Sequence, residues 1–85
     1  MDDLLVFPCE FEIKIFGNAS DQFEIEVLSI IRKHVQDLGE DAIRCRLSKD
    51  KKYLALTIKI NAQSKSQLDD IYRDLSSSPH VLMSL

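Results

Sequence analysis

The chain has 85 residues, of which 45% are hydrophobic and 29% are charged, and its formal net charge is −3. This length suits one domain over residues 1–85 and is too short for two, and the acidic balance argues against a general nucleic-acid binder. No apolar run approaches the roughly 18 residues of a membrane span. The start MDDLLVFP has acids where a signal peptide carries positive charge. We therefore expect a cytoplasmic protein that does not bind membranes.

The first predicted element is a half-buried β-strand that begins just after Pro8. Apolar residues alternate with residues of the opposite face, which is the period of a strand with one side covered. The apolar set is Cys9, Phe11, Ile13 and Ile15, and the opposite set is Glu10, Glu12, Lys14 and Phe16. Gly17 and Asn18 both tolerate left-handed backbone angles, so we expect them to break the strand.

A helix of about 17 residues is predicted next. Ser20 suits its N-cap, and acids follow in the first turn, near the positive end of the helix dipole. One apolar stripe runs along the helix, formed by Phe23, Val27, Ile30, Ile31, His34 and Leu38. Gly39 suits the position after the last turn, so the helix is predicted to end at Leu38.

The second half of the chain alternates again and then returns to a helical period. Two strands are predicted around residues 43–48 and 53–61, joined as a hairpin by a charged loop. Ser64 and Gln67 have the spacing of a capping box at the start of a second helix. The apolar side of that helix is Leu68, Ile71, Tyr72 and Leu75. Residues 76–79 end it, and HVLMSL closes the chain as a short strand.

The order of the elements, β-α-β-β-α-β, predicts the fold. Two helices are too few to cover both faces of a four-stranded sheet, so both are expected on one face. The predicted class is therefore α+β, with a ferredoxin-like fold and an antiparallel four-stranded sheet in the order 4-1-3-2.

Four stretches of the chain resemble the YbeD-like family of small, uncharacterised bacterial proteins: FPCEFEIKIFG, IIRKH, YLALTIKINAQSKSQLDDIYRDL and HVLMSL. The resemblance implies a ferredoxin-like domain similar to ACT domains, the amino-acid-sensing regulatory modules of metabolic enzymes. It carries over no catalytic residues, and it suggests a link with lipoate metabolism. Cys9 departs from the family pattern, in which a small polar residue such as threonine is expected.

The resemblance to ACT domains points to a ligand site at the turn between the first strand and the first helix, often across a dimer interface. Its residues in this chain are Gly17, Asn18, Ala19 and Ser20. Free N–H groups at a helix start suit a carboxylate or a phosphate. The alternative is that any strand-to-helix turn favours these residue types, and the stretch has neither a GxGxxG motif nor a P-loop.

The cysteines and histidines predict no catalytic or metal site, and we expect no cofactor. Cys9 and Cys45 fall on strands separated by a third strand, too far apart for a disulfide. Both belong to the apolar sets, so they are predicted to be buried small hydrophobic residues. His34 and His80 have no cysteine, serine or carboxylate at the spacing of a triad or a metal site.

The uncovered face of the predicted sheet is the second candidate surface. A partner or nucleic-acid surface is predicted there from Lys14, Phe16, Arg44, Arg46, Tyr53 and Lys59. The last strand is expected to add His80, Leu82 and Ser84 to this face. RNA-recognition domains share the topology and stack bases on aromatic residues of their central strands. The third strand carries Ala55, Thr57 and Lys59 at those positions, which argues against nucleic acid.

These observations predict a non-catalytic regulatory or sensing module of the ACT-like type. It would bind a small metabolite or an enzyme partner at the Gly17–Ser20 turn and the adjacent sheet edge, with a homodimer as one expected form. The alternative is a protein- or nucleic-acid-interaction module that uses the basic open sheet face. An enzyme is not predicted, because the chain shows no paired acid and base, metal cluster or phosphate loop.

Overall fold

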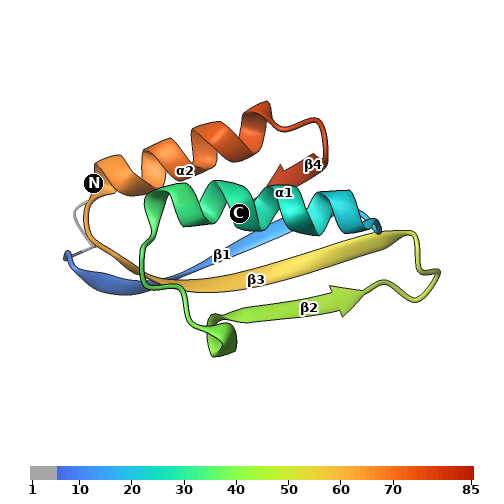
Figure 1. Ribbon diagram of the computed structural model, residues 1–85, viewed down its shortest axis with the longest axis horizontal. Coiled ribbons are helices and arrows are strands. Elements are labelled where there is room, and N and C mark those ends of the chain that lie inside the picture. The colour runs from blue at the N-terminus through green and yellow to red at the C-terminus, as the bar shows by residue number, and fades with distance from the viewer. Residues whose placement is uncertain (1–5) are drawn as a thin grey trace.

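The computed structural model describes residues 6–85, so the acidic start of the chain lies outside the described residues. Figure 1 shows four strands and two α-helices in the predicted order. The elements are β1 (Cys9–Asn18), α1 (Asp21–His34), the short 3-10 helix η1 (Glu40–Ala42), β2 (Ile43–Leu47), β3 (Tyr53–Ala62), α2 (Lys65–Ser77) and β4 (Val81–Ser84).

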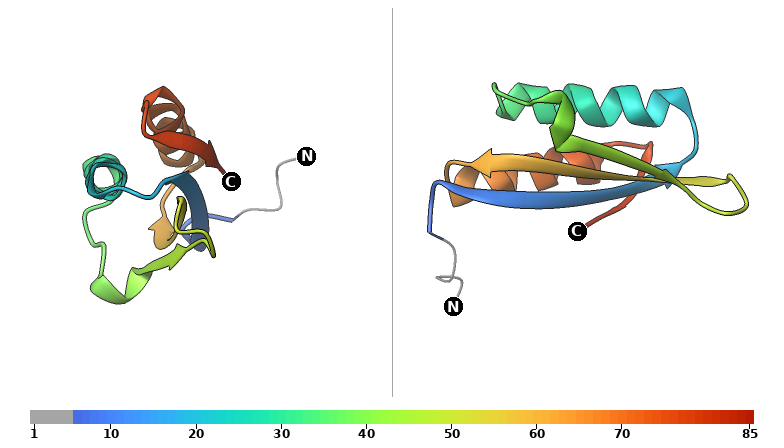
Figure 2. Two further views of the ribbon diagram at one scale, coloured as in Figure 1. Left: turned by 90° about the vertical axis from the view of Figure 1, so that its right-hand side faces the viewer. Right: turned by 90° about the horizontal axis from the view of Figure 1, so that it is seen from below.

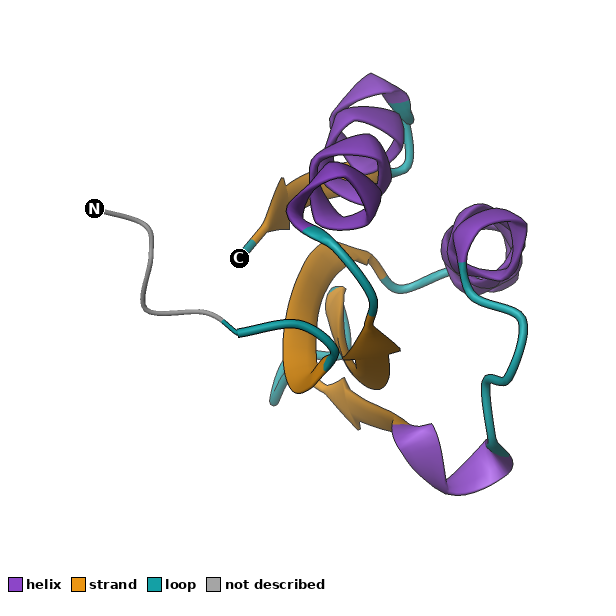
Figure 3. Cartoon of the chain, turned by 90° about the vertical axis from the view of Figure 1, so that its left-hand side faces the viewer, coloured by secondary structure: helices purple, strands orange, loops and turns teal. Residues whose placement is uncertain are grey.

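The sheet confirms the predicted topology. Its order is β2-β3-β1-β4, with all neighbours antiparallel, which is the predicted order 4-1-3-2 read from the other edge. Figures 2 and 3 show α1 and α2 on the same side of the sheet. The ferredoxin-like α+β fold is therefore present, with one covered and one open sheet face.

The core lies between the two helices and the central strands β1 and β3. Nine large side chains are almost completely buried there: Ile13, Ile15, Phe23, Val27, Ile31, Leu56, Ile58, Ile71 and Leu75. They come from the alternating rows of β1 and β3 and from the predicted stripes of both helices. Because apolar burial is the main favourable term in folding, this cluster is what holds the helices to the sheet.

The end of β1 differs from the prediction. Gly17 and Asn18 continue the strand and pair with Leu54 and Tyr53 of β3, and no glycine has a positive φ. Gly17 is needed for space. A Cβ atom there would lie 2.4 Å from the ring of Phe23 and 2.6 Å from the carbonyl oxygen of His80.

The end of α1 also differs from the prediction. The helix stops at His34, and Val35 is extended, with its N–H donating to the carbonyl of Ile31. Val35 is nevertheless buried and Leu38 packs against the core, so both residues extend the apolar pattern without being helical. Gly39 lies in open space and does not cap the helix.

The starts of both helices follow the predicted capping. The hydroxyl of Ser20 accepts from the N–H of Phe23 at 3.1 Å, and the hydroxyl of Ser64 accepts from the N–H of Gln67 at 3.1 Å. The side chain of Gln67 does not complete the usual capping box. It accepts from the N–H of Gln63 and donates to the carbonyl of His34 at 2.7 Å, which joins the start of α2 to the end of α1.

The last strand is bulged, and this changes which of its residues reach the open face. Met83 pairs with Phe16, but Val81 pairs with Gly17, so the register shifts between them. Paired residues share a face. Ser84 therefore shares the helix-covered face with its partner Ile15, and Met83 takes the open-face position. The prediction that Ser84 faces outward was wrong.

The edge strand β2 is mostly exposed, contrary to the prediction for Cys45. Only Ile43 of its five residues is half-buried, and Cys45 and Leu47 are exposed although they lie on the helix-covered face. Cys9 is half-buried against the core. Both cysteines are free thiols, and β3 separates their strands as predicted.

None of the helices in residues 6–85 combines the length and the apolar content that crossing a bilayer requires.

Candidate functional site

The Gly17–Ser20 turn is built as a tight strand-to-helix connection. The N–H of Ala19 donates to the carbonyl of Lys52 at 2.9 Å, and the hydroxyl of Ser20 is used by the helix cap. The ring of Phe23 fills the space beside Gly17. Carboxylates also follow in the first turn of α1, where an anion would be placed by the helix dipole. These contacts explain the four residues structurally, and metabolite binding there stays a prediction.

The open face brings most of the predicted partner surface together. Pairing across the strands places Phe16 of β1 between Met83 and Ala55, and Ala55 next to Arg46. In the next row Lys14 lies opposite Thr57, which lies opposite Arg44. We call the group formed by Lys14, Phe16, Arg44, Arg46, Tyr53, Ala55 and Met83 the open-face patch.

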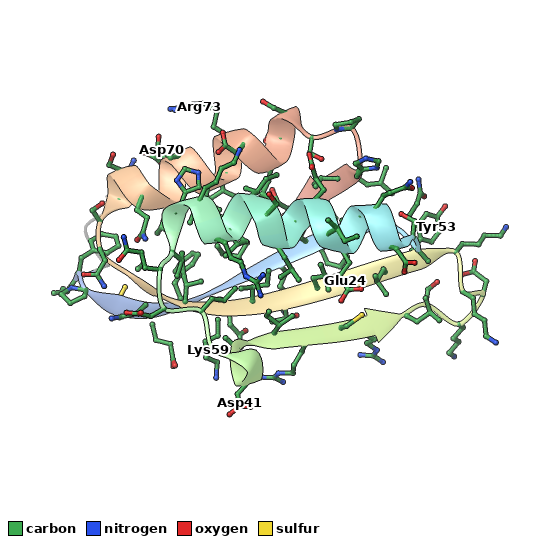
Figure 4. All side chains as sticks on the ribbon, in the orientation of Figure 1. Glu24, Asp41, Tyr53, Lys59, Asp70 and Arg73 are labelled. Carbon is green, nitrogen blue, oxygen red and sulfur yellow. The ribbon has the colours of Figure 1, made fainter. Side chains whose placement is uncertain are left out.

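The apolar part of the open-face patch is accessible. Tyr53 is 49% exposed and Met83 is 50% exposed, while Phe16 is half-buried between them. Tyr53 lies at the first position of β3 (Figure 4). A shallow hollow of about 210 Å³ opens beside it, lined by Phe16, Arg46, Leu47, Ser48, Tyr53, Leu54 and Ala55. Exposed aromatic side chains beside arginine are typical of protein-binding surfaces.

Lys59, the sixth predicted residue, lies farther along the sheet. It pairs directly with Glu12, and the Glu12 carboxylate also reaches the guanidinium of Arg44 at 3.8 Å. Acidic and basic groups are thus mixed around Lys59. Within residues 6–85, no carboxylate forms an ion pair with Lys14 or Arg46, so the positive charge gathers at the apolar end of the face.

The register also decides how closely this face matches an RNA-recognition surface. Ala55 and Thr57 occupy the centre of the open side of β3, opposite Phe16 and Lys14. The two aromatic residues, Phe16 and Tyr53, both lie at one end of the central strands. The face therefore lacks the row of central aromatics that stacks successive bases.

Cys45 is the most accessible thiol, but its surroundings do not activate it. Partial burial and the nearby carboxylate of Glu24 raise the pKa of the Cys45 thiol, so less of the nucleophilic thiolate forms. Figure 4 shows Glu24 on the side of α1 that faces β2. In the described part of the chain, no three histidine, cysteine or acidic side chains cluster as metal ligands do.

His34 joins the two helices. Its Nε2 donates to the carboxylate of Asp74 at 2.7 Å, from the last residue of α1 to the last turn of α2. A carboxylate only accepts, so the ring nitrogen is the donor. This hydrogen bond, together with the nearby charges of His34, Lys33 and Arg73, lowers the pKa of the Asp74 carboxyl.

The lowered pKa of Asp74 predicts a pH-dependent contribution to stability. A carboxyl whose pKa is lower in the folded state stabilises the fold above its unfolded pKa and loses this effect as the pH falls through the folded value. We expect Asp74→Asn to melt below the wild type at pH 6, and the gap to close as the pH falls below about 4. Thermal unfolding of both proteins between pH 2.5 and 7 measures this; an equal gap at every pH would contradict it.

Sequence reasoning missed one member of the open-face patch. The sequence predicted His80, Leu82 and Ser84 on this face and did not name Met83, which the bulge in β4 brings outward. Leu85 lies beside it: its N–H and carbonyl both bond to Lys14, at 2.7 and 3.0 Å. The run of apolar residues at the end of the chain was the sequence feature that could have indicated an apolar contribution to the open face.

Comparison with known proteins places this fold in a bacterial family. The profile described as "Protein of unknown function (DUF493)" matches residues 2–85. The UPF0250 protein of Nitrosomonas europaea is 38% identical over 84 residues, covering 99% of this chain and 97% of the relative. The UPF0250 protein of Chromobacterium violaceum is 39% identical over 83 residues, covering 98% and 93%.

A solved structure is similar as well. The solution structure of protein HP0495 from H. pylori superposes with a TM-score of 0.77 at 14% sequence identity, covering 95% of this chain and 85% of that protein. At this identity the likeness concerns the fold alone.

Proposed function

The chain belongs to the DUF493 family, the bacterial UPF0250 proteins, as the YbeD-like resemblance predicted. For this member of the family, we propose a non-catalytic regulatory module that binds an acidic protein partner. The observation that carries the proposal is the open-face patch. It combines exposed aromatic and apolar side chains with cations on a sheet face that neither α-helix covers.

The chemistry of the patch supports a protein partner. Tyr53 and Phe16 offer rigid apolar area, which is what anchors most of the binding energy in protein interfaces. Lys14 and Arg46 add positive charge beside it, which favours an acidic surface and speeds encounter. Nucleic acid is the weaker candidate because the central positions of β3 are Ala55 and Thr57, which offer no stacking platform.

The contacts of His34 and Cys45, two side chains of types that often serve in catalysis, support a non-catalytic role. His34 is held by Asp74 between the helices, and the pKa of the Cys45 thiol is raised. Regulation would then act through the partner, whose activity changes when it is bound. The link with lipoate metabolism and the ligand site at Gly17–Ser20 stay predictions.

The test compares two matched double variants as bait for partners from a lysate of the native bacterium. Lys14→Glu with Met83→Glu changes the open-face patch. Lys33→Glu with Ile25→Glu makes the same change of charge on α1, where Lys33 and Ile25 are also exposed. We expect a protein partner that the wild type and the α1 variant retain and the patch variant loses. The bound proteins are identified by mass spectrometry.

Two results would overturn the proposal. One is a partner retained equally by both double variants, which would place binding elsewhere. The other is retention that nuclease treatment abolishes, which would show that nucleic acid occupies the patch. Circular dichroism and thermal unfolding of each variant establish that the fold is intact before capture.

A further inference from the structure

Within the described residues, the outer edge of β2 has main-chain hydrogen-bonding groups that pair with no other strand. The N–H of Ser48 donates to the carbonyl of Tyr53 at 2.9 Å, so Ser48 points its main chain toward β3. Main-chain groups alternate in direction along an antiparallel strand. Those of Arg44 and Arg46 therefore also bond to β3, and those of Ile43, Cys45 and Leu47 point outward. Within residues 6–85 no strand pairs with this edge (Figure 1).

The side chains of β2 divide into two chemical rows. Ile43, Cys45 and Leu47 lie on the helix-covered face, and Leu47 is still 47% exposed. Arg44 and Arg46 lie on the open face, and the side chain of Arg44 is 71% exposed. The edge thus presents an apolar row on one side, a cationic row on the other, and free N–H and carbonyl groups between them.

A second copy of this chain is disfavoured in a symmetric pair centred on the middle of β2. A symmetric antiparallel pair centred on Cys45 would place Arg44 of each copy opposite Arg46 of the other. Centring the pair on either arginine would place that arginine opposite itself. Like charges directly opposite each other destabilise a strand pair, and charged residues at an edge are a common protection against self-pairing.

We propose that the β2 edge takes up an extended segment of the partner protein in which acidic residues alternate with apolar ones. The acids would lie beside Arg44 and Arg46, and the apolar side chains beside Ile43, Cys45 and Leu47. The chain already contains one strand of this composition: β1 alternates Glu10 and Glu12 with Cys9, Phe11 and Ile13, and Glu12 reaches Arg44 across β3. The inference rests on the proposed function and adds the β2 edge as a second contact with the same partner.

The test uses a synthetic eight-residue peptide that alternates glutamate with valine, and measures amide hydrogen exchange by NMR. Saturating peptide is expected to slow exchange at Ile43, Cys45 and Leu47, whose N–H groups point outward. It is expected to leave Arg44 and Arg46 unchanged, because theirs already bond to β3. A matched peptide with lysine in place of glutamate is expected to bind about tenfold or more weakly, since it places like charges beside the arginines.

A second variant pair isolates the main-chain contribution. Cys45→Pro removes one outward N–H at an edge position where proline is tolerated, and Cys45→Val keeps it. We expect the proline variant to lose the protection and the valine variant to keep it. Equal binding of both peptides, protection that does not alternate, or full binding by Cys45→Pro would each overturn the proposal. So would protection at the same amides in the free protein that rises with its concentration, because a second copy would then occupy the edge.

These outcomes are separate from those of the proposed function. The capture experiment changes Lys14 and Met83, which lie on β1 and β4, away from the β2 edge. A partner lost by that variant together with unprotected β2 amides would leave the open-face proposal intact and reject the edge. Alternating protection of the β2 amides, together with a partner that the Lys14→Glu and Met83→Glu variant still retains, would support the edge and reject the open-face proposal.

Discussion

Gly17→Ala is expected to lower the free energy of unfolding by about 3 kcal/mol, the upper end for forcing extra volume into a packed site. The new Cβ would lie 2.4 Å from two ring atoms of Phe23 and 2.6 Å from the main-chain oxygen of His80. Alanine is normally better than glycine in a strand by roughly 0.5–1 kcal/mol, so the steric term outweighs propensity. Urea unfolding of the variant and the wild type measures the difference.

The size of this loss matters because the domain is small. At about 0.05–0.15 kcal/mol per residue, a chain of this length has a stability of roughly 4–13 kcal/mol. Gly39→Ala is the matched control, since nothing lies within 4 Å of its Cβ position, and we expect a change of less than about 1 kcal/mol there. A Gly17→Ala protein as stable as the wild type would show that Phe23 and β4 move aside easily.

The packing around Gly17 also explains the residue types of the strand-to-helix turn. The residue types of Gly17–Ser20 suggested a ligand loop, but local sequence does not show what packs against a glycine. Phe23 belongs to the next helix and His80 precedes the last strand, 63 residues after Gly17. A loss of partner binding in a Gly17 variant would therefore reflect a damaged fold.

The architecture was predictable because each element carries its own period. In β3, Leu54, Leu56, Ile58 and Ile60 alternate, and all four are buried. The helices have apolar stripes whose members contact those same strands. With both helices forced onto one side, the uncovered face and most of its residues followed from the alternation alone.

Coverage of an edge strand was not predictable in the same way. Ile43, Cys45 and Leu47 alternate as clearly as the residues of β3, yet Cys45 and Leu47 are exposed. Periodicity shows which face a side chain points to, but the reach of the neighbouring helix decides whether that face is buried. β2 lies at the outer edge of the sheet, where the two helices leave four of its five residues exposed. That incomplete coverage is the feature on which the β2-edge proposal depends.

The bulge in β4 and the end of α1 could not be predicted from the sequence, because both depend on tertiary contacts. Val35 and Leu38 are buried through tertiary contacts after α1 has ended, so they extend a helical stripe that the backbone does not follow. The register shift between Phe16 and Gly17 depends on how β4 meets β1. HVLMSL alone does not contain it, and Met83 was therefore absent from the predicted surface.

Tyr53→Ala is expected to weaken binding of the captured partner by about thirtyfold, because truncating a central aromatic anchor typically costs 2 kcal/mol or more. Tyr53 is half-exposed beside Phe16, Ala55 and Arg46, so its ring is free to be covered by a partner. The fold should be little affected, since the side chain lies outside the core. Titration calorimetry with the purified partner measures the affinity, and urea unfolding checks the stability.

Tyr53→Phe separates the two parts of this side chain and completes the prediction. The ring supplies most of the apolar area, so we expect the phenylalanine variant to bind within about threefold of the wild type. If it binds as weakly as the alanine variant, the hydroxyl is the recognised group and the partner contributes a polar contact there. If Tyr53→Ala binds as well as the wild type while the Lys14→Glu and Met83→Glu variant does not, the anchor lies at the Met83 end of the patch, and the hollow beside Tyr53 is not part of the interface.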